Sequence, residues 1–261
     1  MLLIAVAADA QANRIKRYRF EVLETVPQSR EHFVQGLQIV EGMLYMGTGL
    51  YGASKLLEYD FPSMELRRQT NLPNDLFGEG ITRFADKIYQ LTYRAQKLLV
   101  YDAESFELTH TLPIRAQGWG ITHNSEHLVY SDGSANLYFL DRNSASVVRT
   151  LPVTLNGRPL ARINELEWID GRIWANVWQA NQLIEINPST GVVESVADLR
   201  GLLDPKLRQD DTDVLNGIAW DSERKHLWVT GKRWPKIYRI RLIEFGLPPR
   251  PAPGPVKPEA P

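Results

Sequence analysis

One glutamate stands out because the pattern around it recurs along the chain. Glu79 is followed by glycine and an apolar residue, and similar segments repeat at intervals of about 40–50 residues. The five equivalent positions, called register positions below, are Gln35, Glu79, Trp119, Asn164 and Asn216. They offer one carboxylate, three amides and one indole, a set that can move a proton and hydrogen-bond a small polar molecule.

A second set of side chains recurs in the turn between the second and third apolar segments of each repeat. The equivalent residues there are Gly49, Tyr93, Gly133, Trp178 and Lys232. If the repeats surround a common axis, two aromatic rings and one ammonium group join the register residues. The two sets together predict a pocket with aromatic walls, one acid–base group, amides and one cation, which suits a small polar ligand.

Each of these residue types also has a purely structural interpretation. A glutamate beside glycine is typical of a solvated turn, and a lysine is more often a surface charge. Trp119 and Trp178 fit a packed core equally well, and the two asparagines can cap turns. His123 and His127 flank a strand turn instead of sharing a helix face, so their spacing does not predict a metal site.

The repeats also predict the elements that position these residues. Each contains three short alternating apolar segments separated by turn signals, and four repeats contain a fourth. The fifth repeat runs into a proline-rich end, whereas an unassigned strand-like segment, 17–23, precedes the first repeat. We therefore predict an all-β, five-bladed β-propeller with four-stranded antiparallel blades, in which the N-terminal strand closes the last blade. The charged stretch 200–212 is expected to be an irregular loop over one face, or a helix.

Composition limits the classes of function. The chain has 261 residues, 43% hydrophobic and 23% charged, as in ordinary soluble globular proteins. A formal net charge of −1 argues against nucleic acid or an anionic membrane as partner. With no cysteine, the chain cannot use disulfides, thiolate catalysis or cysteine-bound metal. We expect a monomer.

The two ends differ from the rest of the chain. Residues 1–12 combine a short apolar run with the small-x-small sequence Ala10-Gln11-Ala12, which predicts a partial signal peptide and a periplasmic or secreted protein. Residues 13–246 are expected to form a single β-propeller domain. Residues 247–261 are proline-rich and nearly devoid of large apolar side chains, which predicts a disordered tail.

Several longer segments are similar to one known family. They are Phe33-Val34-Gln35-Gly36-Leu37, Thr48-Gly49-Leu50-Tyr51-Gly52, Phe77-Gly78-Glu79-Gly80, Gly118-Trp119-Gly120, Asn164-Glu165-Leu166-Glu167, Trp174-Ala175-Asn176-Val177-Trp178, Asp213-Val214-Leu215-Asn216-Gly217-Ile218-Ala219-Trp220 and Thr230-Gly231-Lys232-Arg233-Trp234-Pro235-Lys236. From about Phe33 to Leu242 the sequence resembles the plant and bacterial type of glutaminyl-peptide cyclotransferase (glutaminyl cyclase), a five-bladed propeller. The resemblance implies an enzyme that converts the N-terminal glutamine of peptides or proteins to pyroglutamate and releases ammonia, with no cofactor and no zinc.

The resemblance also implies roles for individual residues. Glu79 would be the general acid–base residue, and Lys232 and Asn164 would assist it. The implied substrate-binding residues are Gln35, Phe33, Phe77, Tyr93, Trp119, Trp178 and Asn216. There are two departures from the family's pattern: Met46-Gly47 stands where Glu-Ser is usual, and Tyr93 where tryptophan is usual.

Two other functions compete with this interpretation. One is a non-catalytic propeller that binds peptide N-termini or another small polar ligand. The combination of Glu79, Asn164 and Lys232 favours the enzyme, because a binding protein needs no proton shuttle. The other is a metal-dependent propeller hydrolase, for which the sequence lacks an evident set of acidic and histidine ligands.

Overall fold

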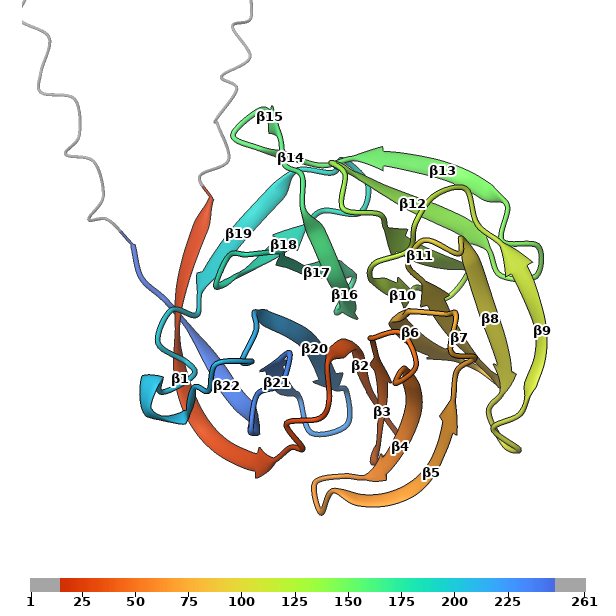
Figure 1. Ribbon diagram of the computed structural model, residues 1–261. Coiled ribbons are helices and arrows are strands. Elements are labelled where there is room, and N and C mark those ends of the chain that lie inside the picture. The colour runs from red at the N-terminus through yellow and green to blue at the C-terminus, as the bar shows by residue number, and fades with distance from the viewer. Residues whose placement is uncertain (1–14, 247–261) are drawn as a thin grey trace, which may run out of the picture.

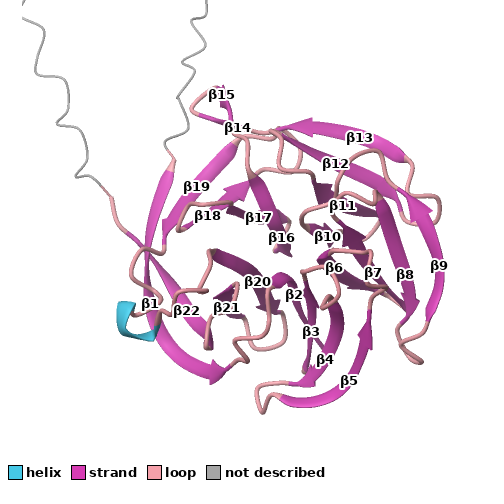
Figure 2. Cartoon of the chain, viewed as in Figure 1, coloured by secondary structure: helices cyan, strands magenta, loops and turns pink. Residues whose placement is uncertain are grey.

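The computed structural model describes residues 15–246, so the expected signal peptide at 1–12 and the expected tail at 247–261 lie outside the described residues. Within the described range the chain is all-β, as predicted (Figure 2). Its helical content there is one short 3-10 turn, η1 (Pro205–Leu207). This turn lies in the charged stretch 200–212, which is otherwise irregular.

Three sheets each contain four antiparallel strands in chain order. The first contains β2 (Val34–Val40), β3 (Met43–Thr48), β4 (Lys55–Asp60) and β5 (Glu65–Asn71). The second contains β6 (Gly78–Phe84), β7 (Lys87–Thr92), β8 (Lys97–Asp102) and β9 (Leu108–Pro113). The third contains β10 (Ile121–His123), β11 (His127–Ser131), β12 (Asn136–Asp141) and β13 (Val147–Pro152). A small hairpin that the sequence did not predict, β14 (Thr154–Leu155) and β15 (Arg158–Pro159), follows the third sheet.

A fourth sheet has eight strands because the N-terminal strand joins two groups of strands. One group is β16 (Ile163–Ile169), β17 (Arg172–Val177), β18 (Gln182–Ile186) and β19 (Val193–Asp198). The other is β20 (Leu215–Asp221), β21 (His226–Gly231), β22 (Lys236–Glu244) and β1 (Lys16–Pro27). β1 pairs antiparallel with β22 from Pro27–Lys236 to Tyr18–Glu244, and a short parallel pairing joins it to β19. The pairing of the N-terminal segment with the last strand is therefore confirmed, over a longer strand than predicted.

The strand groups surround a common centre, with β2, β6, β10, β16 and β20 innermost (Figure 1). Neighbouring innermost strands contact one another around the ring. β2 is almost wholly buried, whereas β5, at the outer edge of the same sheet, is mostly exposed. This gradient follows from the geometry, since the inner strands have neighbours on every side.

Apolar clusters fill the spaces between neighbouring strand groups. In one of them Tyr45 and Leu56 from the first sheet pack with Ile88 and Leu99 from the second. Burying one such aliphatic side chain contributes about 1.5–3 kcal/mol. Repeated around the ring, these contacts hold the innermost strands, and hence the register residues, in fixed relative positions.

Close packing at the centre explains the glycines of the repeated pattern. A Cβ atom on Gly80 would lie 2.7 Å from the carbonyl oxygen of Trp119, far too close for a side chain. In the fourth repeat Glu165 replaces the glycine, and its side chain crosses to the neighbouring strands. Its carboxylate accepts hydrogen bonds from the N–H groups of Leu37 (3.2 Å) and Ile218 (2.9 Å). Glu165 therefore links three innermost strands at the centre of the ring.

No helix within residues 15–246 is long and apolar enough to cross a membrane.

Candidate active site

The register residues lie where the innermost strands depart from regular pairing. In four of these strands the pairing with the neighbouring strand shifts at the register residue. The shifts fall between Val34 and Gly36, Gly78 and Ile81, Ile163 and Leu166, and Leu215 and Ile218. Such a bulge leaves a residue outside the ladder and re-aims its side chain, which is why bulges are common beside functional sites. Trp119, the fifth register residue, comes just before β10.

A cavity of about 210 Å³ lies at this end of the ring. Its lining residues are Phe33, Gln35, Phe77, Glu79, Tyr93, Trp119, Asn164, Trp178, Asp213 and Lys232. All but one of the site residues expected from the sequence therefore meet in one place. The exception is Asn216, which is buried beside the cavity. Its side-chain amide donates to the carbonyl oxygen of Val34 (3.0 Å) and to Oε1 of Gln35 (3.4 Å), so it positions Gln35.

The turn residues are held by backbone hydrogen bonds to the segment that precedes each register position. The N–H of Tyr93 donates to the carbonyl oxygen of Phe77 (3.0 Å), and the N–H of Trp178 donates to that of Arg162 (2.8 Å). In the same way, the N–H of Lys232 donates to the carbonyl oxygen of Val214 (2.9 Å). Two turns carry glycine because a ring occupies the space where a side chain would lie. A Cβ on Gly49 would be 2.4 Å from the Phe77 ring, and one on Gly133 2.6 Å from the Trp119 ring.

Aromatic rings form two groups in the cavity wall. Trp119 and Trp178 pack edge to face with ring centroids 5.7 Å apart. Phe77 contacts Phe33 at 6.2 Å and Tyr93 at 5.9 Å. Such pairs prefer specific geometries, so neighbouring rings hold one another in defined orientations along the cavity wall.

Two buried polar atoms of the lining lack a hydrogen-bond partner among the described residues: Nε1 of Trp119 and Oδ1 of Asn164. A buried donor or acceptor left unsatisfied costs about 1–3 kcal/mol. One donor and one acceptor are thus available to a bound ligand.

The electrostatics centre on Glu79 and Lys232, each only 5% exposed. Burial raises the pKa of the Glu79 carboxyl well above its ordinary value, while the nearby Lys232 ammonium opposes the rise. Burial likewise lowers the pKa of Lys232, and Glu79 and then Asp213 oppose that shift. Nζ of Lys232 lies 4.8 Å from the centroid of the Phe33 ring, a favourable cation–π distance. Glu79 therefore holds its proton more tightly than a surface glutamate does.

Asp213 is a lining residue that the sequence reasoning did not single out. It stands three residues before a register position, inside a segment noted for its resemblance. Its N–H donates to the carbonyl oxygen of Lys232 (3.1 Å), and its own carbonyl accepts from Nε1 of Trp234 (3.0 Å). Asp213 thus fixes the Lys232 turn and adds a second carboxylate to the cavity.

The departures from the family's pattern have separate consequences. Met46 is fully buried in an apolar cluster and does not line the cavity. Tyr93 does line it, beside Phe77. The exposed ring of Tyr51 lies 5.4 Å from Phe77, at the edge of the same aromatic group, and was not predicted.

The two histidines of the sequence analysis lie away from this cavity. His123 stacks on Phe84 with ring centroids 4.3 Å apart, and His127 lies beside Glu126. Over residues 15–246, no group of three or more histidine, aspartate or glutamate side chains is arranged to hold a metal ion.

Comparison with known proteins agrees with the sequence resemblance. The family model described as glutamine cyclotransferase matches residues 1–242. The glutaminyl-peptide cyclotransferase of Arabidopsis thaliana is 36% identical over 230 residues, which cover 85% of this chain and 71% of the plant protein. The crystal structure of Myxococcus xanthus glutaminyl cyclase matches with a TM-score of 0.83 at 29% identity, covering 89% of this chain and 100% of that one. The chain belongs to the glutamine cyclotransferase family.

Proposed function

We propose that this protein is a glutaminyl-peptide cyclotransferase, which converts the N-terminal glutamine of peptides or proteins to pyroglutamate and releases ammonia. Family membership and the names of the two relatives support this activity. The observation that carries the proposal is the buried Glu79 carboxyl, which shares an aromatic-walled cavity with Lys232.

The reaction needs one proton moved between two nitrogens of the same substrate. The α-nitrogen forms a bond to the side-chain amide carbon, and the bond from that carbon to the amide nitrogen breaks. The α-amine loses a proton and the leaving nitrogen gains one, with no oxidation or reduction. Glu79 acts first as general base and then as general acid, an effect typically worth about 10²–10⁴-fold. Its raised pKa suits both steps.

The other lining residues supply charge stabilisation and orientation. Lys232 stabilises the negative charge that develops on the amide oxygen during attack. Oδ1 of Asn164 accepts a hydrogen bond from the α-amine, and Nε1 of Trp119 donates one to the substrate. The aromatic walls hold the glutamine side chain folded back towards its own α-nitrogen, which lowers the entropic cost of ring closure.

We extend the proposal to the finer features expected from the sequence. The strand groups are five blades of one propeller domain spanning residues 13–246, as the repeat spacing and the β1–β22 pairing support. The enzyme works without a metal because Glu79 performs the proton transfer itself. It acts as a monomer, and the sequence of residues 1–12 supports export to the periplasm or secretion.

The test is to incubate the purified, folded protein with a glutamine-initiated dipeptide and to measure ammonia and pyroglutamyl product together. The same dipeptide acetylated on its α-nitrogen is the control, because it has no free amine to attack. We expect equal amounts of ammonia and product from the free dipeptide, none from the acetylated one, and no effect of a chelator. Binding of the free dipeptide without ammonia release would instead support a non-catalytic binding protein.

A further inference from the structure

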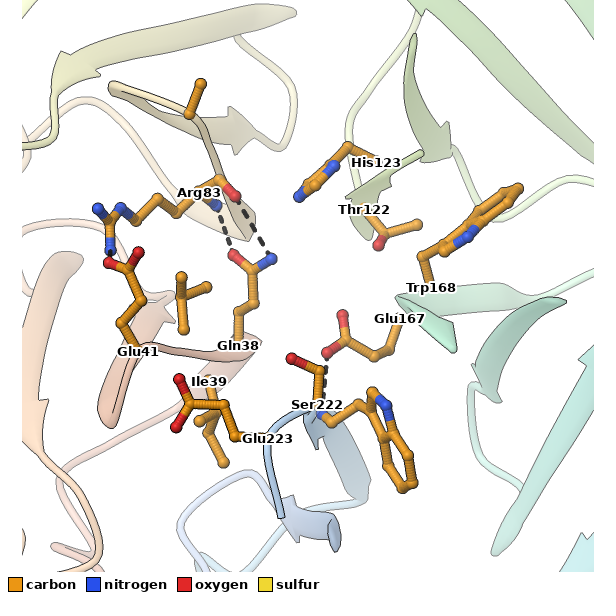
Figure 3. A pocket seen from close by; sticks show the side chains of 13 residues that line it. Gln38, Ile39, Glu41, Arg83, Thr122, His123, Glu167, Trp168, Ser222 and Glu223 are labelled. Atoms are coloured by element: carbon orange, nitrogen blue, oxygen red, sulfur yellow. Dashed lines mark hydrogen bonds and ion pairs between the residues drawn. The ribbon is translucent and has the colours of Figure 1, made fainter. Parts of the chain in front are cut away.

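A second cavity, of about 380 Å³, is lined by residues further along the innermost strands. Gln38, Thr122 and Glu167 each lie three residues after a register position and line this cavity instead of the first. Figure 3 shows their side chains converging from separate strands. Its size falls within the range of about 300–1,000 Å³ typical of small-molecule sites.

Three buried polar side chains project into this space (Figure 3), of which Gln38 is hydrogen-bonded to the backbone of Arg83. Glu167 is 5% exposed, and its Oε1 accepts a hydrogen bond from the N–H of Trp220 (2.9 Å). Thr122 is 1% exposed, and its hydroxyl has no hydrogen-bond partner among the described residues. Leaving that hydroxyl unsatisfied costs free energy, which a ligand that hydrogen-bonds to it would recover.

The charges around the cavity favour a cation. Glu41 and Glu223 line it together with Glu167. Among the described residues of the lining, Arg83 is the one permanent cation, and it is paired with Glu41 at 3.0 Å. Burial lowers the pKa of His123, which disfavours a positive charge on its imidazole. The lining therefore has an excess of negative charge.

We propose that this cavity binds the protonated head group of a small primary amine. An ammonium group has three donors, which match the Glu167 carboxylate, the free Thr122 hydroxyl and a carboxylate at the edge of the cavity. The volume exceeds that of an ammonium ion, so the ligand carries a short alkyl chain. This site lies apart from Glu79 and does not depend on the proposed activity.

The test uses n-butylammonium as the probe and n-butanol as its neutral counterpart of equal length. Binding is followed by NMR through the indole N–H signals of Trp168 and Trp220, which line the cavity. We expect butylammonium to shift both signals and butanol to shift neither. Burial raises the pKa of Glu167 to about 8, so affinity should rise by about tenfold or more from about pH 6 to about pH 9. An alkylammonium of lysine-like pKa stays charged over that range.

Matched variants test whether butylammonium binds in this cavity. At about pH 9, where Glu167 is ionised, Glu167→Gln keeps the acceptor for the Trp220 N–H but removes the charge, and it should weaken binding at least about tenfold, the equivalent of one lost charge-assisted hydrogen bond. Thr122→Val, nearly the same shape, should weaken it less. Glu79→Gln, which changes the other cavity, should leave affinity unaltered. Absence of shifts, equal shifts with butanol, or unchanged affinity in Glu167→Gln would each overturn the proposal.

Discussion

The two cavities are formed by the same innermost strands, yet they differ in the chemistry they offer. Glu79 and Glu167 are equally buried, and burial raises the pKa of both carboxyls. Glu79 faces a lysine inside an aromatic enclosure, whereas Glu167 lies in a larger cavity whose edge carries further carboxylates. In the proposed mechanism a raised carboxyl pKa is therefore not sufficient for catalysis. The neighbouring cation and the aromatic walls distinguish Glu79 from Glu167 as the proposed proton carrier.

Glu165 adds a third buried carboxyl that faces neither cavity. Its pKa is also raised by burial and by Glu167, yet both of its oxygens accept backbone hydrogen bonds. Its geometry indicates a structural role. In the two proposals Glu79 carries the proton and Glu167 supplies the charge that binds a ligand, whereas Glu165 links strands.

The largest expected effect is on turnover when the charge of Glu79 is removed. Glu79→Gln should lower kcat for a glutamine-initiated dipeptide at least about a hundredfold, from the usual magnitude of general acid–base catalysis. Glu167→Gln is the matched control and should retain near-normal turnover. Near-normal turnover in Glu79→Gln would exclude Glu79 from the proton transfer.

Removing the central linker should lower stability. Glu165→Leu leaves the N–H groups of Leu37 and Ile218 without acceptors, so the free energy of unfolding should fall by about 2–4 kcal/mol. Denaturant unfolding measures this, with Glu165→Gln as a control that keeps one acceptor and should lose less. Equal stability of the leucine variant and the unmodified protein would contradict the structural role.

Lys232 should affect both the rate and its pH dependence. Lys232→Met removes the charge that favours ionised Glu79, so the pKa of Glu79 rises further and the acid limb of the kcat/KM profile moves to higher pH. We also expect about a tenfold loss at neutral pH from weaker charge stabilisation. An acid limb that stays in place, or moves to lower pH, would show that Lys232 does not act on Glu79.

A smaller effect is expected on the pH dependence of stability, through Glu167. The pKa of Glu167 is about 8 in the folded protein, above its unfolded value. Protonated Glu167 therefore contributes fully to the free energy of unfolding below about pH 4.5, and this contribution is lost as the pH rises through about 8. Glu167→Gln does not titrate, so the variant does not lose stability in this way. Relative to the unmodified protein, the variant should gain about 1 kcal/mol or more in free energy of unfolding between about pH 5 and about pH 9. A constant difference over this range would argue against a raised pKa.

The sequence predicts the candidate active site better than the rest of the molecule, for a physical reason. Glu79 and its equivalents recur at intervals of about 40–50 residues because four repeats place the register residue at a bulge in the innermost strand, and the fifth places it just before that strand. Asp213 lies off that register, and its contact with the Lys232 turn depends on how two loops meet. Thr122 and Glu167 look like ordinary strand residues until the ring brings them together. The linkage through Glu165 likewise requires three strands from distant parts of the chain.

The location of the substrate tests the central claim most directly. Trp119 and Trp178 line the cavity that contains Glu79, whereas Trp168 and Trp220 line the cavity that contains Glu167. The indole N–H signals of these four residues therefore report on the two cavities separately. The Glu79→Gln variant, which should bind a glutamine-initiated dipeptide without consuming it, is titrated with that peptide by NMR. We predict that Trp119 and Trp178 shift at lower peptide concentration than Trp168 and Trp220, because the second cavity is proposed to bind only the ammonium group. The opposite pattern would contradict the assignment of the active site.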